Sequence, residues 1–286
     1  MKSLTLIGVN GDSIPLELEL TSDFTVNGQA GGLGFLAQQF ASIEGAGDGK
    51  TVRNVRTPSR QIDIPVRMFA ADEAGINLVQ RRLTAAMRWR PGMTMPRLVV
   101  ELDDGSYFLE VLLVTPSMMD ADHFAEWSTW LFTFEAPQPH WQAVDAVNLP
   151  VYGQAPVDPL LPNLLPDVSL SSASVLGAVE VDNPGTEDAP VVWIVTGPFT
   201  SCTITLADGR SWSLGAVVGG TTITVDTRKP KRVTDQTGAN QYGLLGPAPK
   251  LFHLPPGESL VDINVVGATS ATSVSGYYYT RFGAIF

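Results

Sequence analysis

Apolar residues alternate with polar ones along much of this chain, and this period of two constrains its fold more than any other feature. Residues 14–20 alternate strictly, and residues 61–69 and 127–135 repeat the pattern, the last with three aromatic side chains on one face. Residues 98–102 and 107–114 flank an Asp-Asp-Gly-Ser turn, which predicts a β-hairpin. The chain is therefore expected to be mainly β.

One segment, residues 72–89, has the period of an α-helix instead. Its apolar positions with helical spacing are Ile76, Val79, Leu83 and Ala86 or Met87. Asp72 is the predicted N-cap, and the Pro-Gly pair after Arg90 ends the helix. The first part of the chain is expected to be an α+β domain with one helix.

Prolines mark a boundary between this domain and an all-β second part. Five prolines fall between Asn148 and Asp167, a density typical of an extended connector. The strands expected after it are 178–181, 191–195, 201–206, 211–214, 221–226, 251–254, 259–266 and 273–281. We predict a first domain at 1–145, a linker at 146–167 and a β-sandwich at 168–286.

The segment 21–58 is rich in glycine and has little apolar pattern. We expect a long loop that becomes ordered only against a neighbouring subunit, because loops of this length in compact domains are usually functional or disordered. The alternative is a mobile surface loop.

Composition limits the functions open to the chain. The net charge is −11 over 286 residues, so the surface should repel nucleic acid and anionic membranes. No signal peptide or membrane span is expected, because no apolar run is long enough. The single cysteine, Cys202, lies among alternating apolar residues and is predicted to be a small buried hydrophobe.

Charge is segregated within the first domain. Residues 50–97 hold ten basic and three acidic residues, whereas 101–145 hold nine acidic and no basic ones. In a ring, a basic face of one subunit can meet an acidic face of the next; alternatively, the two segments pair within one subunit. The candidate inter-subunit contacts are Arg53, Arg56, Arg60, Arg81, Arg82, Asp120, Asp122 and Glu126.

No motif for chemistry is present. The three histidines, His123, His140 and His253, are too far apart for a helical metal-binding motif, and no nucleophile, phosphate-binding or dinucleotide-binding motif occurs. We therefore expect no catalytic residue, no cofactor and no metal. A glycosidase remains the alternative enzyme, since its two carboxylates need not be close in sequence.

Aromatic residues of the second part allow a carbohydrate-binding alternative. These residues are Trp193, Trp212 and the run 277–279 of three tyrosines, two of which share a strand face. Aromatic rings bind sugar faces, but large aromatics are more often part of a core, and we expect them there.

Three stretches carry a resemblance to a known family. The first is 60–67 with the helix that follows it. The second is the aromatic strand 130–135 with the sequence Ala-Pro-Gln-Pro-His-Trp directly after it. The third is a series of motifs that begins at Asn183-Pro184-Gly185 and continues through 221–226 to 252–259. Together they resemble the distal tail proteins (Dit) of long-tailed phages. Glu258 and Ser259 stand where that family commonly has an asparagine.

The resemblance implies a structural protein of the virion. Its first domain would form a homo-hexameric ring at the tail tip, and its second would be a galectin-like sandwich. The implied partners are the tail tube protein, the tail-tip hub and receptor-binding proteins, with genomic DNA passing through unbound and no membrane insertion. Assembly would take place in the host cytoplasm.

Overall fold

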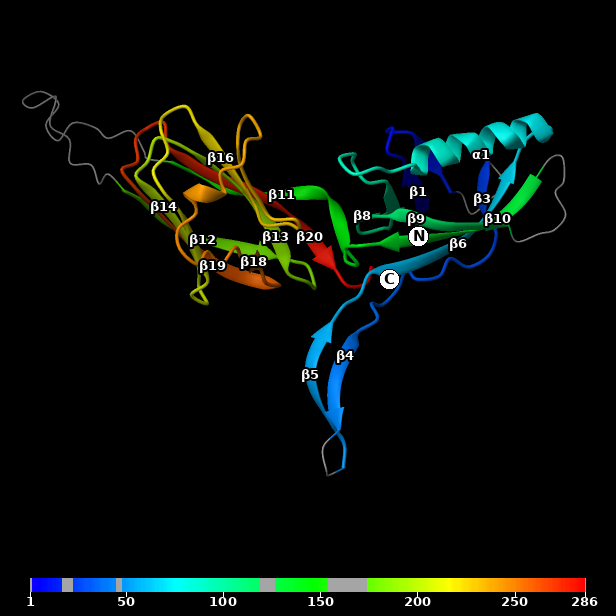
Figure 1. Ribbon diagram of the computed structural model, residues 1–286, viewed down its shortest axis with the longest axis horizontal. Helices are drawn as coiled ribbons and strands as arrows, with labels where there is room; N and C mark the ends of the chain where they lie inside the picture. The colour runs from blue at the N-terminus through cyan, green and yellow to red at the C-terminus, as the bar shows by residue number, and fades with distance from the viewer. Residues whose placement is uncertain (1, 17–22, 45–47, 119–126, 154–173, 286) are drawn as a thin grey trace, which may run out of the picture. The chain divides into compact units, whose positions relative to one another are not determined.

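The protein, described here by a computed structural model, divides into two compact units (Figure 1). The structure describes residues 2–16, 23–44, 48–118, 127–153 and 174–285. Unit 1 comprises Met1–Val144 and Phe282–Phe286, and unit 2 comprises Asp145–Arg281. The expected mainly β fold, with an α+β first part and a sandwich in the second, is confirmed. Within the described residues, no helix has the length and hydropathy to cross a bilayer.

Unit 1 contains two antiparallel sheets and one helix. The first sheet has the order β11-β8-β7-β1-β2, formed by Trp141–Gly153, Ser106–Glu110, Arg97–Glu101, Ser3–Ile7 and Ser13–Pro15. Only residues 141–144 of β11 belong to unit 1, and the rest of this strand belongs to unit 2. The second has the order β3-β6-β10-β9, formed by Phe24–Val26, Arg60–Phe69, Trp127–Ala136 and Leu112–Met118. The predicted hairpin is β7 and β8, and the long alternating segments are β6 and β10.

Helix α1, Glu73–Met87, begins where the sequence predicts. Asp72 accepts a hydrogen bond from the Gly75 amide at 2.7 Å and so caps the helix. The buried face of α1, Ile76, Val79, Leu83, Ala86 and Met87, joins one core with both sheets. A cavity of about 160 Å³ remains between α1 and strands β6, β9 and β10.

The glycine-rich segment is not the loop that we expected. It contains β3 and a separate two-stranded hairpin of β4, Gln39–Glu44, and β5, Lys50–Arg56. At Gly32 the chain needs a glycine for its backbone geometry. This residue has φ +79°, and a Cβ there would collide with the carbonyl oxygen of Gln61. The prediction failed because both strands of the hairpin are fully exposed, so the sequence shows no contrast between a core face and a solvent face.

Unit 2 is a β-sandwich. One sheet has the order β12-β19-β14-β15, formed by Ser174–Asn183, Gly257–Val266, Ser201–Leu206 and Ser211–Leu214. The other has the order β17-β16-β13-β20, formed by Arg232–Asp235, Thr222–Asp226, Ala189–Thr196 and Ser273–Phe282, with β18, His253–Leu254, paired to β13. Its core includes Trp193, Trp212 and Cys202, as predicted.

Two of the expected boundaries differ from the observed elements. Residues 146–153 of the expected linker continue strand β11, and the remaining 154–167 lie outside the described residues. The last residues, 282–286, cluster with unit 1 and not with the sandwich. Of the alternating segment 14–20, residues 14 and 15 are in β2, and 17–20 lie outside the described residues.

Candidate inter-subunit surface

The β4–β5 hairpin stands off from the two sheets of unit 1 and pairs with neither (Figure 1). Every residue of both strands is exposed. A two-stranded hairpin without a covered face is at best marginally stable in water. The hairpin therefore projects as an arm that gains little stability from the sheets of unit 1.

Apolar side chains gather on one face of this arm. Phe40 pairs with Val55 and Ser42 with Val52, so alternation along β4 places Phe40, Val55 and Val52 on the same face. Phe40 is 64% exposed, and each of the two valines is 54% exposed. Apolar clusters left in water in this way mark interaction sites.

The predicted basic contacts Arg53 and Arg56 lie on β5, beside the apolar face. Asn54 pairs with Ala41 and Val52 pairs with Ser42, so Arg53 between them has no partner residue on β4. Arg53 therefore lies at a β-bulge. Arg56 donates two hydrogen bonds to the Gln39 side chain, at 2.9 and 3.1 Å. Both arginines are exposed, and no carboxylate of the described residues forms an ion pair with either.

Arg60 does not fit the prediction of a surface contact, because it is buried within unit 1. Its guanidinium donates to five carbonyl oxygens, those of Gly32, Leu33, Gly34, Pro139 and Gly283. Burial lowers its pKa to about 10, which leaves it charged at neutral pH. The carbonyl oxygens thus compensate the charge in place of a carboxylate.

This arrangement makes Arg60 the anchor of the hairpin. Arg60 begins the strand after β5, and the carbonyls of Gly32, Leu33 and Gly34 come just before β4. The guanidinium also lies 5.8 Å from the centre of the Trp141 ring, whose Nε1 donates to Leu33. Both ends of the arm are therefore fixed to unit 1 by one side chain.

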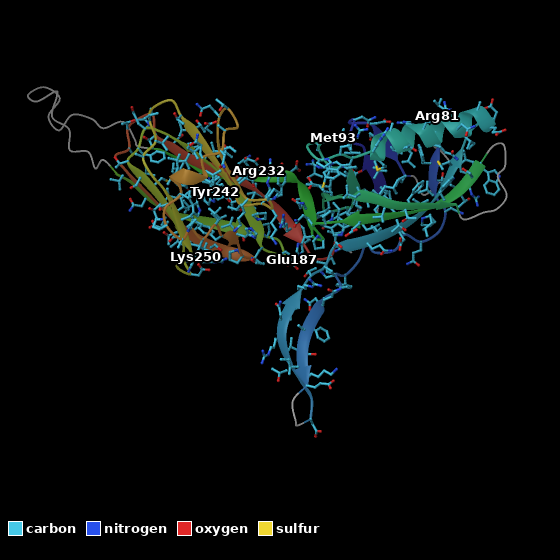
Figure 2. The ribbon with its side chains drawn as sticks, in the orientation of Figure 1. Arg81, Met93, Glu187, Arg232, Tyr242 and Lys250 are labelled. Carbon is cyan, nitrogen blue, oxygen red and sulfur yellow. The ribbon has the colours of Figure 1, made fainter. Side chains whose placement is uncertain are left out.

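Arg81 and Arg82 lie next to each other on α1 but differ in their partners. Arg81 is exposed and has no polar partner among the described residues (Figure 2). Arg82 forms a two-point ion pair with Asp12, with both distances 2.8 Å. This hydrogen bonding lowers the pKa of Asp12 and raises that of Arg82. Arg82 therefore already serves a contact inside the chain.

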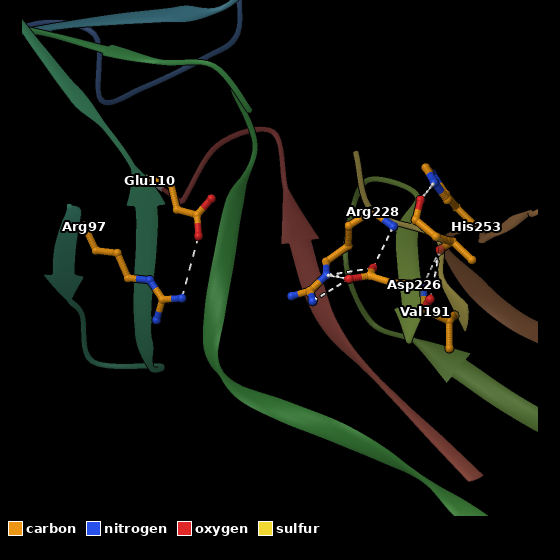
Figure 3. Close-up of polar contacts among 7 residues, drawn as sticks. Arg97, Glu110, Val191, Asp226, Arg228 and His253 are labelled. Carbon is orange, nitrogen blue, oxygen red and sulfur yellow. Dashed lines mark hydrogen bonds and ion pairs between the residues drawn. The ribbon is translucent and has the colours of Figure 1, made fainter. Parts of the chain in front are cut away.

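The acidic candidates Asp120, Asp122 and Glu126 lie outside the described residues. Elsewhere the basic and acidic segments do meet inside the subunit, as the alternative interpretation required. Strand β6 pairs along its length with β10. On β7, Nη2 of Arg97 lies 3.6 Å from Oε1 of Glu110 on the neighbouring strand β8 (Figure 3). The segregated charge is thus partly used within unit 1. Of the basic candidate contacts, Arg53, Arg56 and Arg81 are exposed and form no ion pair with the described residues.

Two side chains that could take part in catalysis, Cys202 and His253, are engaged in the fold of unit 2. Cys202 is fully buried, and burial raises the pKa of its thiol to about 12, so the thiolate is absent at neutral pH. The ring of His253 is bonded to the Thr227 carbonyl at 3.2 Å (Figure 3). Across the part of the chain that the structure describes, no three His, Cys, Asp or Glu side chains cluster to hold a metal ion.

Sequence reasoning missed the apolar face of the hairpin. A signal for it exists, since Phe40, Val52 and Val55 occur on both sides of the glycine-rich turn between Glu44 and Lys50. An ion pair between Glu44 and Lys50, with 2.8 Å between Oε1 and Nζ, joins the two strands at this end of the hairpin.

No protein-family model and no curated protein sequence matches the chain. Among solved structures, it is similar to the Dit protein of phage SPP1, described as a paradigm of hub adsorption apparatus in Gram-positive infecting phages. The TM-score is 0.64 at 14% identity, with 96% of this chain and 98% of that chain covered. The chain has the fold of a phage Dit protein.

Two structures of the phage P2 baseplate in its activated conformation match as well. The one with calcium has a TM-score of 0.61, and the one with strontium has a TM-score of 0.59. Each is 9% identical, with 99% of both chains covered. The Dit fold thus accounts for both units, and at this low identity the likeness concerns the fold.

Proposed function

We propose that this chain is a structural distal tail protein of a long-tailed phage, which assembles as a closed homo-hexameric ring at the tail tip. The exposed hairpin carries this proposal, because a marginal arm with an apolar face suits a contact with the next subunit. Ring closure needs two different faces on each subunit, and an arm and its acceptor surface satisfy that need. The Dit fold of both units supports the assignment.

The ring would join the tail tube protein to the tail-tip hub and to receptor-binding components. Its subunits carry a net charge of −11 each, so phosphate is repelled and DNA passes without being held. Such a conduit needs stiffness and shape and no catalytic group. We also propose that units 1 and 2 are separate domains, with ring contacts assigned to unit 1.

The decisive experiment removes the apolar face of the arm. Phe40→Ser with Val55→Ser should convert the assembled protein to monomer in sedimentation velocity, because the arm loses the apolar area that it buries in the ring. The matched control, Val218→Ser with Leu260→Ser, alters two exposed apolar residues of unit 2 and should leave assembly unchanged. A ring that survives the first pair of substitutions would refute the role of the hairpin.

We expect the exposed charges of the hairpin to affect the alignment of neighbouring subunits and their rate of association more than their affinity. Arg53→Glu with Arg56→Glu should therefore weaken the ring most at low salt, while the monomer stays folded, if the acceptor surface includes acidic residues such as Asp120, Asp122 and Glu126. Arg60 is left out of this test because its loss would disturb the fold. If the association constant of the ring changes neither with the charge reversal nor with the salt concentration, the proposed contribution of Arg53 and Arg56 to assembly is wrong.

A further inference from the structure

The outward face of one sheet in unit 2 carries an aligned row of polar and aromatic side chains. Trp193 and Val225 point into the sandwich core, so their neighbours Val192 and Asp226 lie on the opposite face. Strand register aligns Val192 with Tyr277 on one side and Asp226 with Arg232 on the other. The row therefore crosses four adjacent strands, about 14 Å in all at the usual strand spacing.

A tyrosine pair forms one end of this row. Tyr277 and Tyr279 are on the same face of β20, with ring centres 6.1 Å apart and planes at 86°. Both are half-buried, in contrast to Tyr278, which belongs to the core. Our expectation of core positions is thus wrong for these two tyrosines. Each presents part of a ring to water, an apolar surface with a polar edge.

Arg228 forms an ion pair with Asp226, which Figure 3 shows, and it is close enough to both tyrosines to interact with them electrostatically. Arg228 donates from Nε and Nη2 to the two carboxylate oxygens of Asp226, at 2.9 and 2.7 Å. The side chain of Arg228 is 41% exposed and that of Asp226 is 17% exposed. Val192, which lies between Tyr277 and Asp226 in this row, is buried. Nη1 of Arg228 takes no part in the pair, so the guanidinium retains donors for a ligand.

Positive charge surrounds this ion pair in an otherwise acidic unit. Residues 226–232 contain four basic residues and one acidic residue, while unit 2 as a whole contains seven basic and twelve acidic residues. Lys229 and Arg232 are exposed and have no polar partner among the described side chains. Arg232 can be seen in Figure 2. Lys231 donates to the Leu251 carbonyl at 3.0 Å. The turn is a local attractor for anions.

We propose that the strip formed by Arg228, Lys229, Arg232, Tyr277 and Tyr279 binds an acidic polysaccharide, one whose sugar units carry phosphate or carboxylate groups. The tyrosine rings would contact the apolar faces of sugar rings, while the guanidinium groups and the ammonium group would bind the anions. Asp226 would accept hydrogen bonds from sugar hydroxyls. An acidic peptide could use the cations but would have no need of the tyrosine pair.

The test measures binding of the full chain to immobilised polymers by interferometry. Phosphomannan and polygalacturonate are the two anionic glycans, dextran is the neutral glycan, and poly-L-glutamate is the acidic peptide. Wild-type protein should bind both anionic glycans, more weakly as salt rises, and should prefer them to dextran and poly-L-glutamate. Binding to only one of them would identify phosphate or carboxylate as the recognised group.

Two double variants separate charge from aromatic contact. Lys229→Ser with Arg232→Ser, and Tyr277→Ser with Tyr279→Ser, should each weaken binding by roughly tenfold or more. Arg210→Ser with Lys250→Ser removes the same charge from elsewhere in unit 2 and should leave binding within about twofold of wild type. Circular dichroism confirms that each variant is folded, and the exposed charge pair keeps the test valid if the tyrosine variant is not.

Three outcomes would overturn the proposal. The first is that wild-type protein binds neither anionic glycan. The second is equal loss in the Lys229–Arg232 and Arg210–Lys250 variants, which would show a response to net charge alone. The third is equal binding of poly-L-glutamate with no effect of the tyrosine substitutions, which would identify an acidic protein segment as the partner. Ring assembly is measured separately and is not affected by any of these results.

Discussion

Replacement of Arg60 by methionine tests whether a buried guanidinium holds the base of the hairpin. Methionine fills similar space but cannot donate a hydrogen bond. We expect the carbonyls that now converge on Arg60 to lose their shared donor, and the segment before β4 to separate from the start of β6. The substitution should therefore destabilise unit 1 and loosen the arm.

The size of the effect follows from the contacts. The Pro139 carbonyl is bonded to Nε at 2.9 Å in a buried position, and loss of a buried partner costs about 1–3 kcal/mol. Leu33 keeps the Trp141 indole as a donor, and water can reach the part-buried carbonyls of Gly32, Gly34 and Gly283. Loss of the Trp141 contact adds about 0.5–2 kcal/mol, and removal of a desolvated charge offsets part of it. The expected net destabilisation is about 2–4 kcal/mol.

Urea unfolding gives the free energy, and hydrogen exchange of the peptide 28–36 reports on the base of the arm. This peptide contains the Gly31 amide, which is bonded to the Asp63 carbonyl at 2.8 Å and should exchange faster in the variant. Arg53→Met, at an exposed position, is the control and should stay within about 0.5 kcal/mol of wild type. If Arg60→Met behaves like that control, the anchor interpretation is wrong.

Three further predictions concern single residues. Cys202 should resist alkylation at pH 8 in native protein and react at once in urea, because burial raises its thiol pKa to about 12; fast native reaction would place it at the surface. Burial lowers the pKa of His253 below 6.5, so the unfolded chain binds a proton more readily, and stability should fall as pH drops below about 6.5. His253→Gln should flatten that dependence in acid urea titrations, unless other groups cause it. Asp72→Ala removes the cap of α1 and should lower the stability of unit 1 by about 1 kcal/mol, whereas no loss in thermal unfolding would argue against the cap.

Regular patterns along the sequence predicted much of this fold. The alternation in 61–69 and 127–135, and the helical period after Asp72, each belong to long elements that bury one face in a common core. Patterns of this kind depend on neighbours in the sequence, so they can be recognised without the fold. Each of the eight strands expected in unit 2 overlaps an observed one, although 251–254 overlaps only the two-residue strand β18.

The errors have a different physical origin. Arginine is normally a surface residue, and nothing near Arg60 in the sequence reveals that carbonyls from 26 to 223 residues away would surround it. The hairpin was missed because both its strands are exposed and therefore lack the contrast between a core face and a solvent face. Strand β17 was missed because it is short and follows the basic turn that contains Pro230.

The association state of the purified chain tests the central claim most directly. Native mass spectrometry, with electron microscopy of the same sample, should find six chains of 30.6 kDa in one closed ring with an open centre. The ring should be lost when Phe40 and Val55 are replaced by serine. A protein that remains monomeric at every concentration, or that forms open filaments without closing, would contradict the account.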